Sequence, residues 1–151
     1  MPDAAPDPYF QLIGEAGIIT QIATTFLEAR LPDGLMVSHF GVINHLIRVR
    51  DGATPLELAR AFQVPKNTMT YTLGGLRRHR FVEIRPNPED KRSKQVWLTE
   101  AGRRFRAEAL RDMAPVIEAM SDRFGRGRVE KMLPDLADFR AMIDRLRDEM
   151  S

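Results

Sequence analysis

A run of polar and basic side chains between positions 66 and 71 is the part of this sequence best suited to recognising a ligand by hydrogen bonds. Lysine, asparagine, threonine and tyrosine side chains supply donors and acceptors that can pair with base edges in the major groove of B-DNA. The candidate base-contacting residues are Lys66, Asn67, Thr68, Thr70 and Tyr71. The alternative is an ordinary solvated helix face, and the surrounding elements favour the first interpretation.

Basic side chains extend this candidate surface. Arg77 and Arg78 lie at the end of the same predicted helix, and Arg92 and Lys94 lie in a predicted hairpin. Their charges attract phosphates, and arginine is also drawn to the negative potential of a minor groove. Residues 45–111 carry fifteen Lys or Arg against seven Asp or Glu, although the formal net charge of the chain is only +2. Such a basic block is typical of proteins that bind a phosphate backbone.

Two predicted helices position the polar run. Thr54 can cap the first of them, Pro55 suits its first position, and Glu57 completes a capping box, which predicts a short helix over 55–62. A turn separates it from a second helix over 65–79. The inner face of this second helix is formed by Met69, Leu73 and Leu76.

A hairpin follows these helices. Residues 81–85 and 95–98 alternate apolar and polar side chains, as strands do, and the segment 86–93 between them is polar and contains two prolines. A helix-turn-helix followed by a hairpin is a winged helix-turn-helix, and the B-DNA major groove, about 12 Å wide, admits one helix. The expected fold class is therefore mainly α with a small β-hairpin wing.

Longer helices are predicted on both sides of this region, over 9–30 and 36–50, from Thr99 to about Phe124, and after Gly127. In the last helix, apolar residues from Val129 to Met150 alternate spacings of three and four, as in a coiled-coil seam. A monomer of 151 residues cannot easily cover these stripes. We therefore expect a homodimer, the alternative being an intramolecular helical bundle.

The expected organisation is a single domain over residues 1–151. The winged helix-turn-helix region spans 36–100, and the dimerisation helices span 9–31 and 101–150.

The composition excludes several classes of protein. A chain with 43% hydrophobic and 29% charged residues is typical of a soluble globular domain. Without cysteine it has no disulfide, thiolate metal site or cysteine nucleophile. No apolar stretch reaches the roughly 18 to 20 residues that a membrane span requires, and the first residues lack the pattern of a signal peptide, so we expect a cytoplasmic protein with no membrane partner.

Enzymatic and metal sites are also not expected. We find no nucleophile and base pair and no phosphate-cradling glycine loop. His39 and His45 lie about 240° apart around a helix, so they do not share a face as metal ligands at i and i+4 would. We expect no catalytic residue, no metal and no cofactor.

The segment NPEDKRSKQVWLTEAGR, from Asn87 to Arg103, resembles the D-x-R wing and the V-x-L-T-x-x-G junction of the MarR (multiple antibiotic resistance regulator) family of winged helix-turn-helix transcription factors. Leu58 and Ala59 are similar to the family's LA pair. The resemblance implies that Arg92 contacts the minor groove and that Asp90 pairs with Arg92 and holds the wing. The alternative for Asp90 is an aspartate that only forms a turn.

The same resemblance implies a homodimeric, ligand-responsive repressor that binds double-stranded DNA at a pseudo-palindromic operator. Its effector would be a small anionic or phenolic molecule bound between the dimerisation helices and the winged region. Residues that could line such a cleft are Phe10, Ile13, His39, Phe40, Ile43 and Phe105. Apolar residues at helical spacing are equally consistent with plain core.

Several positions depart from the family pattern. Pro65 stands where a serine cap is usual, Tyr71 where arginine is common, and Met36 replaces a frequent threonine cap, leaving Asp33 or Ser38 as possible substitutes. The pair Gly74-Gly75 lies inside a predicted helix, where it indicates a close backbone approach, a hinge or simple tolerance. These departures leave a second hypothesis, a winged-helix interaction module or dimerising adaptor without specific DNA binding.

Overall fold

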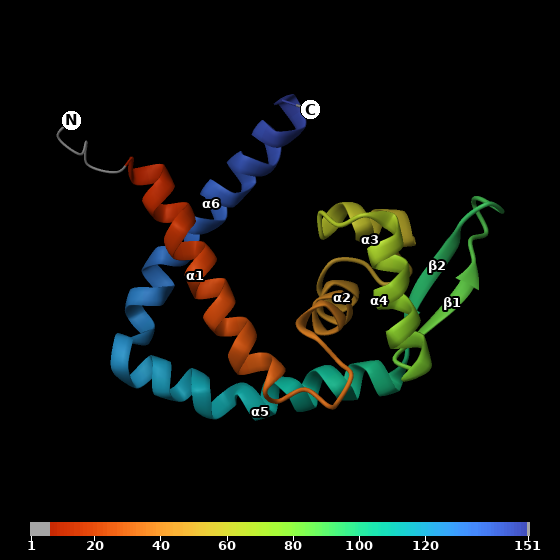
Figure 1. Ribbon diagram of the computed structural model, residues 1–151, viewed down its shortest axis with the longest axis horizontal. Coiled ribbons are helices and arrows are strands. Elements are labelled where there is room, and N and C mark those ends of the chain that lie inside the picture. Colours follow the sequence, from red (N-terminus) through yellow and green to blue (C-terminus); the bar gives the residue numbers. More distant parts are fainter. Residues whose placement is uncertain (1–6, 151) are drawn as a thin grey trace. The chain divides into compact units, whose positions relative to one another are not determined.

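The computed structural model describes residues 7–150 as helices joined by one two-stranded hairpin (Figure 1). The elements are α1 (Pro8–Glu28), α2 (Val37–Arg48), α3 (Pro55–Ala61), α4 (Lys66–Arg78), β1 (Val82–Pro86), β2 (Lys94–Leu98), α5 (Glu100–Phe124) and α6 (Arg126–Met150). The predicted fold class, mainly helical with a small hairpin wing, is confirmed. The ends of the predicted elements differ from the observed ones by a residue or two.

The chain divides into two compact units, Met1–Met113 and Ala114–Ser151, and the division falls within α5. The first unit contains α1 to α4, the hairpin and the first half of α5. The second contains the rest of α5, beginning one residue before Pro115, and α6. The single domain over 1–151 and the assignment of 9–31 and 101–150 to dimerisation stay predictions.

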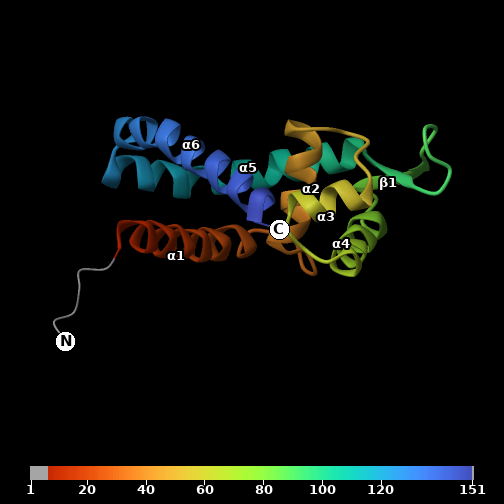
Figure 2. The same ribbon diagram turned by 90° about the horizontal axis from the view of Figure 1, so that it is seen from above.

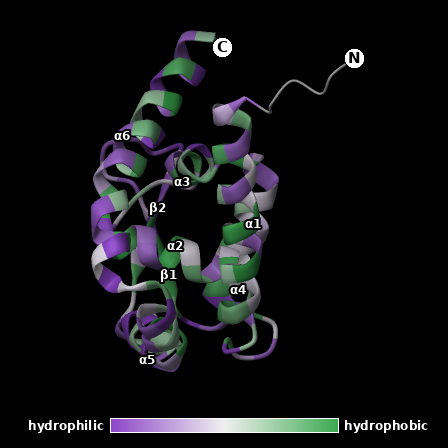
Figure 3. Ribbon diagram, turned by 90° about the vertical axis from the view of Figure 1, so that its left-hand side faces the viewer, coloured by the Kyte–Doolittle hydropathy of each residue, from purple (hydrophilic) through white to green (hydrophobic). Residues whose placement is uncertain are grey.

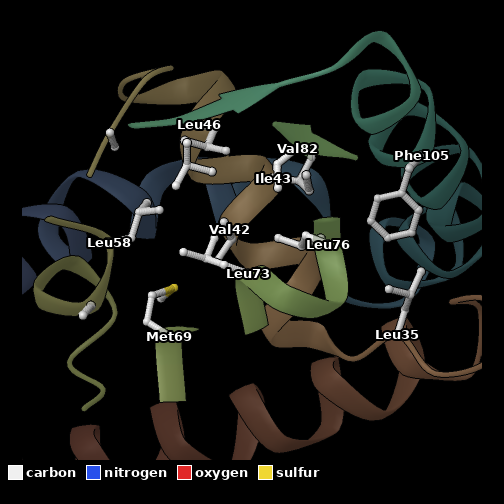
Figure 4. Close-up of a cluster of buried hydrophobic side chains, with 13 residues drawn as sticks. Leu35, Val42, Ile43, Leu46, Leu58, Met69, Leu73, Leu76, Val82 and Phe105 are labelled. Carbon is white, nitrogen blue, oxygen red and sulfur yellow. The ribbon is translucent and has the colours of Figure 1, made fainter. Parts of the chain in front are cut away.

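The hydrophobic core of the first unit lies where α2, α3, α4, the hairpin and the start of α5 meet (Figure 4). Side chains that are at most 1% exposed come from α2, α3, α4 and β2, and they are Val42, Ile43, Leu46, Leu58, Leu76 and Val96. Met69 and Leu73 complete the buried face of α4, as their spacing predicts. Burying each large side chain stabilises the fold by about 1.5 to 3 kcal/mol, so this core fixes α4 against its neighbours.

The predicted capping box starts α3. The Thr54 hydroxyl accepts the Glu57 N–H at 3.2 Å, and the Glu57 carboxylate accepts the Thr54 N–H at 2.7 Å. That backbone N–H, helped by the Arg50 guanidinium at 2.9 Å, lowers the pKa of Glu57. The start of the helix-turn-helix is therefore set by local sequence.

The hairpin joins α5 through a close backbone contact. Its strands are antiparallel, with Val82 opposite Leu98. Thr99 caps α5 by accepting the Gly102 N–H at 3.1 Å, and its hydroxyl donates to the Arg80 carbonyl at 2.7 Å. A Cβ on Gly102 would collide with the Phe81 carbonyl oxygen, so only glycine allows this junction to close.

Helix α6 is amphipathic, and Figure 3 shows apolar residues recurring along it among polar ones. It has no buried residue, and Pro134 lies within it without ending the helix. Its exposed large apolar residues are Val129, Met132, Leu133, Leu136, Met142, Ile143, Leu146 and Met150. No helix in the described range 7–150 is long and apolar enough to cross a membrane.

Candidate DNA-binding interface

Helix α4 turns its polar side chains toward solvent. The predicted residues on this helix are all exposed: Lys66, Asn67, Thr68, Thr70, Tyr71, Arg77 and Arg78. At about 100° per residue, all but Thr68 lie within an arc of about 140° centred near Gly74. Thr68 lies about 60° beyond that arc, beside the buried Thr72. The structure thus brings six of the seven side chains onto one helix face.

Hydrogen bonds within α4 determine which polar groups remain free on this face. Pro65 offers no side-chain cap, but the Asn67 amide oxygen accepts the Thr68 N–H at 2.9 Å and satisfies one donor of the first turn. The Thr70 hydroxyl donates to the Lys66 carbonyl at 2.9 Å. Asn67 therefore presents its amide NH2 outward, and Thr70 presents a lone pair and a methyl group.

The wing loop is held by short hydrogen bonds. The Asp90 carboxylate accepts the Arg92 N–H at 2.9 Å, and the Asp90 carbonyl accepts the Ser93 N–H at 3.0 Å. The Asn87 amide donates to the Ser93 hydroxyl at 2.7 Å. Asp90 thus contacts Arg92 through the main chain, as a turn-forming aspartate does. The ion pairs found within residues 7–150 include none between these two side chains.

Helix α4, the candidate recognition helix, shares one groove with the wing, which is the hairpin of β1 and β2. Figure 2 shows the loop between β1 and β2 extending beyond the helices of the first unit. A groove of about 260 Å3 is lined by Pro55, Thr70, Leu73, Gly74, Arg77, Ile84 and Lys94. It brings the cationic Arg77 of α4 and Lys94 of β2 to a single concavity. A second, more open hollow of about 520 Å3 lies over Lys66, Asn67 and Thr70.

Asp51 fixes the base of the wing. One carboxylate oxygen accepts the Leu98 N–H at 2.8 Å and the Gly52 N–H at 3.1 Å. The other lies 3.3 Å from the Arg103 guanidinium. One side chain therefore ties the turn after α2 to the end of β2 and the first turns of α5. An aspartate before a glycine is typical of a turn, and the sequence pattern alone does not reveal this wider role.

Comparison with known proteins agrees with this geometry. Residues 33–93 match the sequence model of the MarR family. Over 108 residues the chain is 34% identical to the HTH-type transcriptional repressor YetL of Bacillus subtilis, covering 68% of this chain and 64% of that protein. Over 97 residues it is 30% identical to the transcriptional activatory protein BadR of Rhodopseudomonas palustris, covering 63% of this chain and 54% of that protein. The crystal structure of MarR has a TM-score of 0.79 and 23% identity, covering 93% of this chain and 98% of that chain.

The segment of residues 33–93 is therefore of the MarR family, and the chain has the fold of MarR. The family resemblance predicted from the wing motif is confirmed. MarR-family proteins are regulators rather than enzymes, which agrees with the expectation that no catalytic site exists. The matched region spans less than two thirds of the length of either curated relative.

His39 supplies the cap that Met36 lacks at the start of α2. Its ring nitrogen Nδ1 accepts the Met36 N–H at 2.9 Å, and Glu28 accepts the next one, the Val37 N–H, at 3.0 Å. The prediction that Asp33 or Ser38 caps this helix is therefore wrong. Glu28 of α1 and His39 of α2 accept these backbone N–H groups instead. Sequence patterns for helix capping look for a polar side chain immediately before the helix, so they do not find an acceptor in another helix or a histidine inside the same one.

The two glycines of α4 differ. A Cβ on Gly75 would lie 2.5 Å from Nε2 of His39, so this glycine permits a close approach of α2 to α4. A Cβ on Gly74 would meet only Arg78 Nη1, at an ordinary 3.6 Å. Close approach therefore explains Gly75, and tolerance suffices for Gly74.

The residues predicted to line an effector cleft fall into two groups. His39, Ile43 and Phe105 are at most 4% exposed, and the Phe40 ring meets Phe105 edge-on at 6.4 Å. Phe10 and Ile13 are exposed on the first turns of α1, outside this cluster. Ile43 and Phe105 belong to the core, and the effector cleft stays a prediction.

The histidines have separate structural contacts. His45 packs on the Phe62 ring at 5.5 Å, and His79 stacks on the Phe81 ring at 5.4 Å. Within residues 7–150 no three His, Asp or Glu side chains are grouped as metal ligands.

Proposed function

We propose that this protein is a transcriptional regulator that binds double-stranded DNA with α4 in the major groove and the wing against the backbone or the adjacent minor groove. The observation that carries the proposal is the groove shared by Arg77 of α4 and Lys94 of β2. A phosphate backbone passing over this groove meets both cations while the face of α4 meets base edges. We place this regulator in the cytoplasm.

The contacts divide by chemistry. Lys66 and Asn67 offer donors and Thr70 an acceptor and a methyl group, and the Tyr71 side chain is 72% exposed. These groups suit base edges, whereas Thr68 lies at the margin. The phosphate and minor-groove contacts are assigned to Arg77, Arg78, Arg92 and Lys94, with Asp90 shaping the loop that presents Arg92.

The active form is a homodimer. Support comes from α1 and α6, which have no buried residue and expose apolar stripes that a second copy would cover. A two-fold dimer presents two recognition helices about 34 to 36 Å apart, which matches half-sites one turn of DNA apart. The operator is therefore pseudo-palindromic.

The regulation is repression that a small anionic or phenolic effector relieves. The similarity to YetL, which is named a repressor, supports this direction, while BadR is named an activator, so the direction needs its own test. An effector that binds better to dimers with misplaced recognition helices lowers operator affinity by shifting the population. Expression of a reporter gene placed behind the operator, compared with and without the regulator, shows whether the protein represses or activates transcription.

DNA binding is tested by fluorescence polarisation with the protein's own upstream DNA and an unrelated duplex of equal length, at two salt concentrations. Tight binding to the upstream DNA alone, with the stoichiometry of a dimer and retained at the higher salt, supports the proposal. Equal, weak and salt-labile binding to both duplexes contradicts it, because the basic block then gives only non-specific affinity. The adaptor hypothesis would in that case take its place.

A further inference from the structure

A buried histidine joins the first turn of α2 to the last turn of α4, the proposed recognition helix. His39 is 4% exposed, and its Nδ1 accepts the Met36 N–H at 2.9 Å. Nδ1 can accept this bond only while it carries no proton. The start of α2 is therefore capped by the neutral form of His39.

The opposite edge of the imidazole ring lies against α4. A Cβ on Gly75 would lie 2.5 Å from Nε2 and 3.2 Å from Cδ2 of His39. Glycine inside a helix is unfavourable relative to alanine, so its presence needs a compensating contact. The imidazole ring of His39 provides that contact, and α2 and α4 pack against each other here.

Burial and the positive charges of α4 oppose the protonation of His39. Burial, then the nearby His79 and Arg78 at the end of α4, lower the pKa of His39. From α1, the Glu28 carboxylate accepts the Val37 N–H at 3.0 Å. A proton on Nδ1 would set an N–H donor against the Met36 N–H and place a cation beside Arg78.

We propose that His39 is a positioning residue for the recognition helix. In its neutral form it joins the start of α2 to Gly75, and its protonation loosens this joint and weakens DNA binding as the pH falls. The link to DNA rests on the proposed function, but the joint itself can be tested without DNA. His39 touches no base or phosphate and acts through Gly75 alone.

The first experiment is a double-mutant cycle between the two residues. In H39N the amide oxygen takes roughly the place of Nδ1 and still accepts the Met36 N–H, but no ring reaches Gly75. We expect G75A to lower the Tm and to weaken operator binding about tenfold, because the new methyl group overlaps His39. In the H39N background the same alanine should raise the Tm, since alanine favours a helix. An equal effect of G75A on Tm in both backgrounds would show that His39 and Gly75 are not coupled, and would contradict the proposal.

The second experiment is a pH profile of Tm and of operator affinity at fixed protein concentration. Because the folded-state pKa of His39 is lowered, the stability that depends on neutral His39 is complete above about pH 6.5 and is lost as the pH falls through the lowered value. Below about pH 6.5 the wild type should lose Tm and affinity more steeply than H39N as the pH falls. The matched control H45N should follow the wild-type profile.

The outcomes separate the two proposals. Identical profiles for wild type and H39N would refute the protonation step. If the wild type binds no duplex specifically at any pH, the proposed DNA-binding function is wrong, and so is the proposed effect of His39 on DNA binding. The Tm cycle then decides on its own whether His39 and Gly75 are joined.

Discussion

Helices α4 and α6 both carry an apolar stripe, but only the stripe of α4 is covered by its own chain. Five of the residues of α4 are buried, among them Leu76, which is fully buried. Helix α6 is nearly twice as long and has no buried residue, although its seam from Val129 to Met150 repeats regularly. A covered stripe fixes a helix in place, whereas an exposed stripe needs a partner. The predictions below test this difference.

The largest effect is expected in the core beneath α4. Leu76→Ala removes a fully buried side chain and leaves a cavity, so the free energy of unfolding should fall by about 2 to 5 kcal/mol. Denaturant unfolding at fixed protein concentration measures it. Leu56→Ala, on α3 at 47% exposure, is the matched control and should change stability far less. Equal losses in the two variants would contradict the assigned core.

The next effect tests the seam of α6. Ile143→Asp places a charge at the centre of the proposed dimer contact, where an unpaired carboxylate is costly to bury, so dimerisation should weaken by at least about tenfold. Ala137→Asp adds the same charge off the seam and should leave the dimer intact. Sedimentation across a concentration series distinguishes the two. A monomeric wild type, or equal loss in both variants, would remove the dimer from the proposed function.

The same contrast shows what the sequence could predict. The Thr54 and Glu57 capping box lies within four consecutive residues, and the outward face of α4 follows from apolar spacing, so both could be predicted from local pattern. The contact of Asp51 with the Leu98 N–H joins residues 47 positions apart and depends on how the hairpin packs. No local rule contains such a contact, and the same holds for His39 against Gly75. The contacts with DNA and effector stay predictions.

The wing gives the smallest expected effect. The Arg92 side chain is exposed, and Asp90 holds its backbone N–H rather than its guanidinium, so Arg92→Ala should leave the loop folded and stability within about 0.5 kcal/mol of wild type. Removing one phosphate or groove contact should lower operator affinity and reduce the slope of log affinity against log salt by about 0.9. Lys131→Ala, on α6, removes an equal charge and should leave that slope unchanged if only the winged region meets DNA. If Arg92→Ala changes neither affinity nor slope, the wing does not reach the duplex, and α4 alone carries the recognition.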